Sequence, residues 1–117
     1  RVRKVFGGGM RQAGYLAAAG IYALENNLDL LAQDHLHAKQ IAAALSTKDF
    51  IGKIMPVETN IIIFEVKESY TPKTLCEKFA QHDILCLSIS ATQVRMVTHL
   101  DFTVEMLNKL LKVIDAL

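Results

Sequence analysis

An arginine in the middle of an apolar strand is the residue of this sequence best placed to do chemistry. Arg95 stands between Val94 and Met96, where a charged side chain is costly unless it has a partner. Its planar guanidinium suits a carboxylate, which it can hold through two parallel hydrogen bonds. The alternative is an internal salt bridge from Arg95 to Asp101 or Glu105, which would make the arginine purely structural.

A second candidate site is the run of three glycines near the start of the chain. Gly7, Gly8 and Gly9 are flanked by Lys4 and Arg11. Glycine loses more conformational entropy on folding than any other residue, so such a run is kept where the backbone approaches something closely or where a loop moves. The flanking cations favour an anionic neighbour. A flexible hinge with solvated charges is the alternative.

The other polar residues give little sign of catalysis. A single histidine at a strand end, such as His99, is more often structural than catalytic. His35 and His37 face different directions on a helix, and Asp34 with His37 supplies only two ligands, so we expect no metal site. No nucleophile–base pair and no phosphate-binding or dinucleotide-binding glycine motif is evident. The dispersed basic residues, the formal net charge of +1 and the absence of tryptophan disfavour nucleic-acid binding.

Composition places the chain among folded, water-soluble proteins. Its 117 residues are 51% hydrophobic and 21% charged, and no apolar run reaches the roughly 18 residues of a membrane span. Cys76 and Cys86 are expected to be buried free thiols in a reducing compartment. With no signal peptide evident, the cytoplasm is the expected location. The chain opens at Arg1 without methionine, and we expect it to be part of a longer protein.

The elements that must position these residues follow from the hydrophobic periodicity. Helices are expected over 10–26, over 29–45 with Asp29 as the N-cap, over 72–82 and from 104 onward. Strands are expected at 54–55, 61–66, 84–87 and 94–97, the second of them central. Thr71 and Thr103 are expected to cap the last two helices. This order predicts an α+β fold, a small sheet with helices on one face.

The same pattern predicts which side chains are buried and where the parts of the chain divide. The second helix is expected to bury Leu31, Ala38, Ile41, Ala42 and Leu45, and the last helix Val104, Leu107, Leu110, Leu111 and Ile114. In the fourth strand, Arg95 and Val97 are expected on one face and Val94 and Met96 on the other. Residues 1–28 are expected to form a glycine loop and a linking helix, and residues 29–117 the small α+β domain.

Two motifs resemble the low-specificity L-threonine aldolase family. The first is Arg3-Lys4-Val5-Phe6-Gly7-Gly8-Gly9-Met10-Arg11-Gln12-Ala13-Gly14, followed by the alanine-rich stretch 16–24, and the second is Val94-Arg95-Met96-Val97-Thr98-His99-Leu100-Asp101. They occur in the family's order, and the similarity runs through essentially the whole chain. The resemblance implies the C-terminal small domain of a pyridoxal-phosphate enzyme of fold type I, the aminotransferase-like fold, preceded by linking helices.

The resemblance also implies roles for individual residues. The family cleaves threonine or allo-threonine to glycine and acetaldehyde. Carried over by position, Arg95 would bind the substrate carboxylate, and Arg11, helped by Lys4, would reach the phosphate of pyridoxal phosphate across a dimer interface. Gly7 to Gly9 would pass close to the neighbouring subunit's active site. The family's Schiff-base lysine would precede Arg1, so the chain alone is expected to be inactive and to carry no catalytic residue.

The sequence leaves two alternative functions open and also predicts an assembly. One alternative is a related pyridoxal-phosphate enzyme acting on another β-hydroxy or β-substituted amino acid. Another is a non-catalytic module in which Arg95 binds a free amino acid. The small-residue face of the first long helix and the glycine loop predict a homodimer or homotetramer. We expect an amino-acid substrate, and neither nucleic acid nor membrane as a partner.

Overall fold

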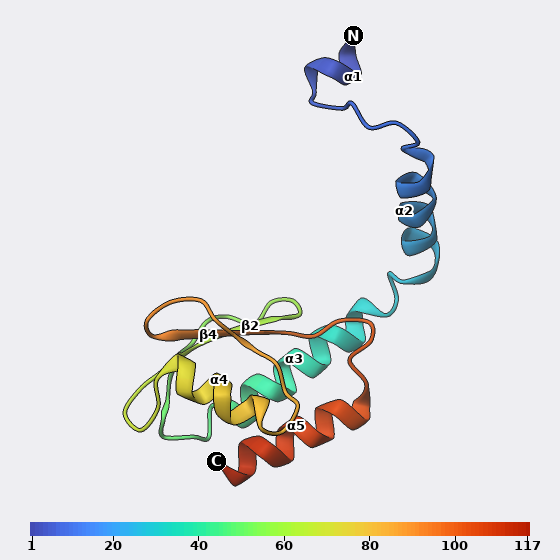
Figure 1. Cartoon of the computed structure of the whole chain (residues 1–117). Helices are drawn as coiled ribbons and strands as arrows, with labels where there is room; N and C mark the ends of the chain where they lie inside the picture. The colour runs from blue at the N-terminus through green and yellow to red at the C-terminus, as the bar shows by residue number, and fades with distance from the viewer.

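A small two-layer domain with a projecting N-terminal arm is the architecture of this chain (Figure 1). The computed structural model describes all 117 residues. The elements are α1 (Val2–Val5), α2 (Gly14–Asn26), α3 (Leu31–Leu45), β1 (Ile51–Ile54), β2 (Ile61–Val66), α4 (Pro72–Ala80), β3 (Leu87–Ser88), β4 (Gln93–Val97) and α5 (Val104–Ala116). The arm consists of α1, α2 and their loop, and the domain contains the rest.

The sheet is antiparallel throughout and has the strand order β1-β2-β4-β3. The central position expected for strand 61–66 is confirmed, because β2 lies between β1 and β4. Ile62 faces Met96 and Phe64 faces Val94 across the β2–β4 pair, and these four side chains are buried. The alternate residues of both strands therefore point to the opposite face of the sheet.

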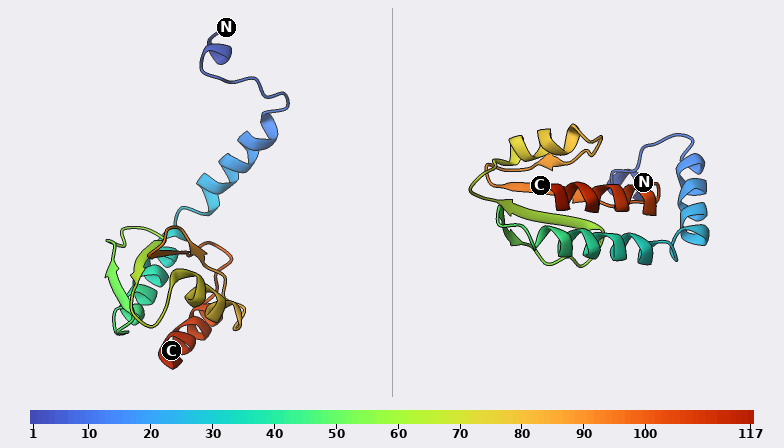
Figure 2. Two further views of the ribbon diagram at one scale, coloured as in Figure 1. Left: turned by 60° about the vertical axis from the view of Figure 1, so that its left-hand side comes forward. Right: turned by 90° about the horizontal axis from the view of Figure 1, so that it is seen from below.

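Helices α3, α4 and α5 cover one face of the sheet and leave the other open (Figures 1 and 2). The core between the layers is apolar and includes Ile41, Phe64, Phe79, Leu107 and Ile114. Burying such side chains is the main favourable contribution to folding, about 1.5–3 kcal/mol each. The expected α+β fold, with a small sheet covered on one face, is confirmed.

Two threonines start the helices that pack on the sheet, as expected. Thr71 Oγ1 accepts a hydrogen bond from the Thr74 amide at 3.2 Å, and Thr74 Oγ1 accepts one from the Thr71 amide at 2.9 Å. With Pro72 at the first helical position, this reciprocal pair fixes the start of α4. Thr103 Oγ1 accepts from the Met106 amide at 3.3 Å and caps α5.

The starts of the first two long helices differ from the prediction. Gln12 has a φ of +52°, so the helix expected from residue 10 begins only at Gly14. Asp29 does not cap α3, whose N-cap is Leu30 without a side-chain hydrogen bond. The amides of Leu30 and Leu31 instead donate to the carbonyls of Asn27 and Leu28. Consecutive turns satisfy the backbone there, and no cap is needed.

The short strands and the helix ends are also shifted. The first strand occupies 51–54 instead of 54–55, and β3 starts at Leu87 instead of residue 84. Asp83 has a φ of +61°, and the Ile84 amide donates back to Phe79, so α4 closes before residue 82 and residue 84 cannot begin a strand. Leu31 and Val104 are exposed, because each lies in the first turn of a helix that extends past the core.

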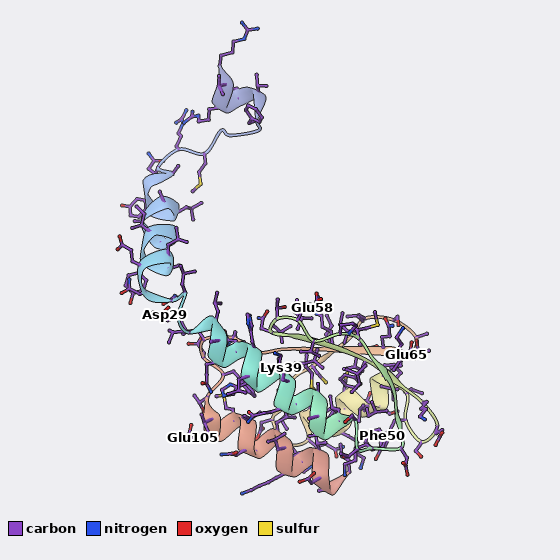
Figure 3. All side chains as sticks on the ribbon, turned by 180° about the vertical axis from the view of Figure 1, so that it is seen from behind. Asp29, Lys39, Phe50, Glu58, Glu65 and Glu105 are labelled. Carbon is purple, nitrogen blue, oxygen red and sulfur yellow. The ribbon has the colours of Figure 1, made fainter.

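The arm joins the domain at the turn that contains Asp29 (Figure 3). All buried residues lie between Asp34 and Ile114, so no residue of α1 or α2 belongs to the core. The arm extends past the level of the sheet on its open side (Figure 1), and the chain measures 56 × 30 × 26 Å. The predicted division at residue 28 remains a prediction, although the structure places that residue in this turn.

Candidate functional site

Arg95 lies at the centre of the open face of the sheet. The burial of β4 alternates, with Val94 and Met96 buried and Arg95 and Val97 exposed, which confirms the expected division of the strand between two faces. In the register, Arg95 is paired with Ile63 of β2 and with Leu87 of β3. Cross-strand partners share a face, so apolar residues flank the guanidinium on both sides.

The guanidinium of Arg95 has no partner within the chain. The two salt bridges of the structure join Lys67 to Glu68 and Lys109 to Asp83. An internal pair from Arg95 to Asp101 or Glu105, the alternative for a structural arginine, is therefore absent. Arg95 needs no internal partner, because its side chain lies on the face of the sheet that no helix covers and is not buried. An arginine in this position is free to bind an anion.

A buried polar junction holds the end of β4 against α3. Thr98, which is 1% exposed, donates from Oγ1 to the backbone carbonyl of Asp34 at 2.8 Å. Its amide donates to the Asn60 carbonyl at 3.0 Å, and Asn60 Nδ2 returns a bond to the Thr98 carbonyl at 2.7 Å. At Thr98, three residues after Arg95, the end of β4 is thus bonded both to α3 and to the loop before β2. Thr98 had no predicted role of its own, although it belongs to the second motif.

The N-terminal half of α3 supplies a second buried polar group beside this junction. His37 is 2% exposed, and its ring meets the edge of Phe102 with 5.7 Å between ring centroids. Its Nε2 is hydrogen-bonded to the Gln33 amide nitrogen, while its Nδ1 has no partner. His37 is therefore part of the packing between α3 and the loop before α5.

The candidate cofactor cations lie on the arm and apart from Arg95. Lys4 lies in the last turn of α1 and Arg11 in the loop between α1 and α2, and both are exposed and without a salt bridge. Within one chain, the loop lies far along the arm from the sheet (Figure 1). The structure therefore does not bring Lys4 and Arg11 together with Arg95, and their predicted roles at the cofactor stay predictions.

Two of the three glycines have a local structural explanation. Gly7 has a φ of +79°, and its amide and that of Gly8 donate to the carbonyls of Lys4 and Arg3 at 3.1 and 2.7 Å. This is the Schellman arrangement that ends a helix, and it favours glycine. A Cβ on Gly8 would lie 2.7 Å from Arg3 Cγ, whereas one on Gly9 would meet nothing within 4 Å. Gly9 is the glycine that this turn does not explain.

A hollow on the helix side of the domain contains none of the candidate site residues. It measures about 520 Å³ and lies between the loop after α4, the end of β4 and α5. Its wall is mainly apolar, and the Lys109–Asp83 pair, 3.0 Å apart, lies on its rim. His99 is also on the rim, where its Nδ1 accepts a hydrogen bond from the Asp101 amide at 3.2 Å. That bond gives His99 a structural role.

Two parts of the structure are available to bind other molecules. One is the open face of the sheet with the unpaired Arg95, and the other is the projecting arm with Lys4 and Arg11. The family model described as "Beta-eliminating lyase" matches residues 1–69. The chain belongs to the beta-eliminating lyase family. The matched region includes the arm and β2, one of the two internal strands of the sheet.

Several relatives bear the name threonine aldolase. The chain is 43% identical over 108 residues to the low specificity L-threonine aldolase of Escherichia coli, covering 92% of this chain and 31% of that protein. It is 36% identical over 105 residues to low-specificity L-threonine aldolase 1 of Arabidopsis thaliana, covering 87% and 29%. The chain thus spans about a third of the length of these relatives. The resemblance stated from the two motifs is confirmed.

Solved structures of pyridoxal-phosphate enzymes share the fold. The chain matches the cystine C–S lyase C-DES, in complex with its product cysteine persulfide, with a TM-score of 0.65 and 17% identity over 88% of this chain and 28% of that one. It matches the ornithine δ-aminotransferase of Plasmodium falciparum with a TM-score of 0.55 and 18% identity over 67% and 20%. The aminotransferase-like, fold-type I class expected from the sequence is confirmed. No helix is both long and apolar enough to cross a membrane.

Proposed function

We propose that the protein containing this chain is a pyridoxal-phosphate-dependent lyase that cleaves L-threonine or L-allo-threonine to glycine and acetaldehyde, with Arg95 binding the substrate carboxylate. The observation that carries the proposal is the unpartnered guanidinium on the open face of the sheet. The names of the relatives support the reaction class.

The surroundings of Arg95 suit the binding of an amino-acid carboxylate. Ile63 and Leu87 flank it on the neighbouring strands, so a molecule that covers this face would exclude water from the guanidinium. Charge-assisted pairs strengthen as the local dielectric falls. A bidentate pair would also fix the orientation of the amino acid, which is what selective cleavage of one bond at its Cα requires. Arg95 binds and orients in this proposal, and it transfers no proton.

The cations of the arm fit the phosphate of the cofactor. Arg11 is a planar donor and Lys4 a point charge, and neither is neutralised by an acid in the structure. Pyridoxal phosphate, when bound, supplies an electron sink for cleavage next to the amino group. In this proposal Arg11 and Lys4 hold the phosphate, Gly9 lets the backbone approach it, and the Schiff-base lysine lies outside this chain, which is inactive alone.

The arm also supports a proposal about assembly. Tyr15, Leu16, Ile21, Tyr22 and Leu24 of α2 are each more than half exposed, which is costly for an isolated surface. We propose a homodimer or homotetramer in which α2 is buried and Arg11 reaches the partner's site. Sedimentation of the whole protein tests this proposal, and a monomer would contradict it.

A second reaction is favoured by the family and by one structural neighbour. The family description names β-elimination, and C-DES is a C–S lyase. The same carboxylate-binding arginine and cofactor would serve an enzyme that removes a β-substituent from its substrate.

The reaction products separate the two candidates. The whole protein, reconstituted with pyridoxal phosphate, is incubated with L-allo-threonine, L-serine and L-cystine in parallel. Release of acetaldehyde and glycine from L-allo-threonine supports the aldolase. Release of a 2-oxo acid and ammonia from L-cystine, without acetaldehyde from L-allo-threonine, would replace it by the elimination. A protein that binds no pyridoxal phosphate contradicts both proposals.

A further inference from the structure

The two cysteines of the chain touch each other where α4 meets the segment before β3. Cys76 lies in the middle of α4, and Cys86 directly precedes the edge strand β3. Their sulfur atoms are 3.3 Å apart, with the Cys86 thiol donating to Cys76 Sγ. Both are free and half-buried, so the buried thiols expected from the sequence are in fact partly accessible. The sequence alone did not indicate that they meet.

The two sulfurs have unequal freedom to move. Cys76 belongs to a helix fixed by the Thr71–Thr74 capping pair and by buried Leu75 and Phe79. Residues 84–86 belong to no helix or strand, and Leu85 is 89% exposed. A disulfide bond is about 2.05 Å long, so an approach of little more than 1 Å closes the gap. Movement of residues 85 and 86 can supply it, while Ile84 stays bonded to α4 through its amide, which donates to the Phe79 carbonyl at 3.1 Å.

We propose that Cys76 and Cys86 are a reversible disulfide site, oxidised by thiol–disulfide exchange with a small-molecule disulfide. One thiolate attacks the external disulfide and forms a mixed disulfide, releasing one thiol. The second thiolate then attacks the bound sulfur, releasing the other thiol and forming the Cys76–Cys86 bond. The two protons pass to the two released thiols, so the external disulfide is reduced as the pair is oxidised.

The surroundings of the pair set the pH dependence of this exchange. The titratable group that faces Cys86 is the Cys76 thiol, with which it shares a hydrogen bond. Burial, and then that hydrogen bond, raise the pKa of Cys86. Since the thiolate is the attacking species, attack by Cys86 is slow near neutral pH and becomes faster as the pH rises.

The site lies beside the strand that flanks Arg95. Leu87 follows Cys86 directly and is the register partner of Arg95. Oxidation would therefore link β3, the strand next to Arg95, covalently to α4. The disulfide site itself does not depend on the proposed reaction.

Trypsin offers a direct readout, because Lys78 lies between the two cysteines. Cleavage after Lys73, Lys78 and Arg95 places Cys76 in the peptide 74–78 and Cys86 in the peptide 79–95. The whole protein is incubated with oxidised glutathione at several pH values, alkylated to block free thiols, digested without reductant and analysed by mass spectrometry. The expected species is the 74–78 peptide linked to the 79–95 peptide, two hydrogen atoms lighter than their sum, more abundant at higher pH and lost on reduction.

Single variants provide the matched controls. In Cys76→Ser and Cys86→Ser the linked species is absent, and the remaining cysteine carries glutathione or stays free. The wild-type protein alone already decides the question if a variant fails to fold. Peptides 74–78 and 79–95 recovered only as separate glutathione adducts, or only as alkylated free thiols at every pH, would overturn the proposal.

Discussion

Replacing Thr98 by valine should loosen the contact between β4 and α3. The buried hydroxyl donates to the Asp34 carbonyl at 2.8 Å, and one such bond contributes about 0.5–1.5 kcal/mol net. In valine a methyl group replaces the hydroxyl, and carbon approaches a carbonyl oxygen only to roughly 3.3–3.6 Å. The variant therefore loses the bond and also pushes the two elements apart. We expect a loss of about 1–3 kcal/mol in the free energy of unfolding.

A matched control separates this junction from the general effect of removing a threonine hydroxyl. Thr47 Oγ1 donates to the Ala44 carbonyl, also at 2.8 Å, but Thr47 is exposed at the end of α3. Water can replace that bond, so Thr47→Val should change stability by less than about 0.5 kcal/mol. Thr98→Ser keeps the donor and should recover most of the loss.

Hydrogen exchange of the Thr98 amide is the suitable assay. This amide donates to the Asn60 carbonyl at 3.0 Å, so its exchange reports on the opening of the junction even in a protein with several domains. Faster exchange in Thr98→Val than in Thr47→Val and wild type is expected. Equal exchange in the two valine variants would refute the reasoning that the buried hydroxyl holds β4 to α3.

Two further predictions concern the helix starts. Thr71→Ala removes one half of the reciprocal bonds to Thr74 and should lower the free energy of unfolding by about 0.5–2 kcal/mol in urea denaturation; an unchanged midpoint would argue against the cap. A hydrogen bond with the Thr103 side chain lowers the pKa of Glu105 below its ordinary value. The stabilisation from Glu105 is therefore complete above the ordinary carboxyl pKa and is lost as pH falls through the lowered pKa. Thr103→Ala should raise the pKa of Glu105 in an NMR titration, and an unmoved pKa would contradict this assignment.

Helices and strands could be predicted where a few adjacent residues determine them. The β-branched run at 61–66 and the Thr71-Pro72 pair each determine an element directly, and both predictions were confirmed. The predicted boundaries were wrong where the backbone adopts a conformation that the residue types do not indicate. Gln12 and Asp83 have positive φ values, and each moved the boundary of an element.

The site was predictable to the extent that strand alternation determines it. Alternation around Arg95 gave the correct face of the sheet, but only the structure shows that this face is open. Contacts between distant parts of the chain lay beyond any local pattern. The bond from Thr98 to Asp34 joins residues 64 positions apart, and the contact of Cys76 with Cys86 depends on how residues 81–85 turn.

The kinetic effect of removing the Arg95 guanidinium tests the central claim most directly. In the whole protein, truncating one partner of a buried charge pair costs roughly 2–5 kcal/mol, which corresponds to a fall in kcat/KM for L-allo-threonine of roughly 30-fold to several thousand-fold. Arg95→Ala should show this loss mainly as a raised KM. Lys53→Ala, which removes an exposed cation from the edge strand β1, should behave like the wild type. If the two variants had the same kcat/KM, Arg95 would not bind the substrate carboxylate.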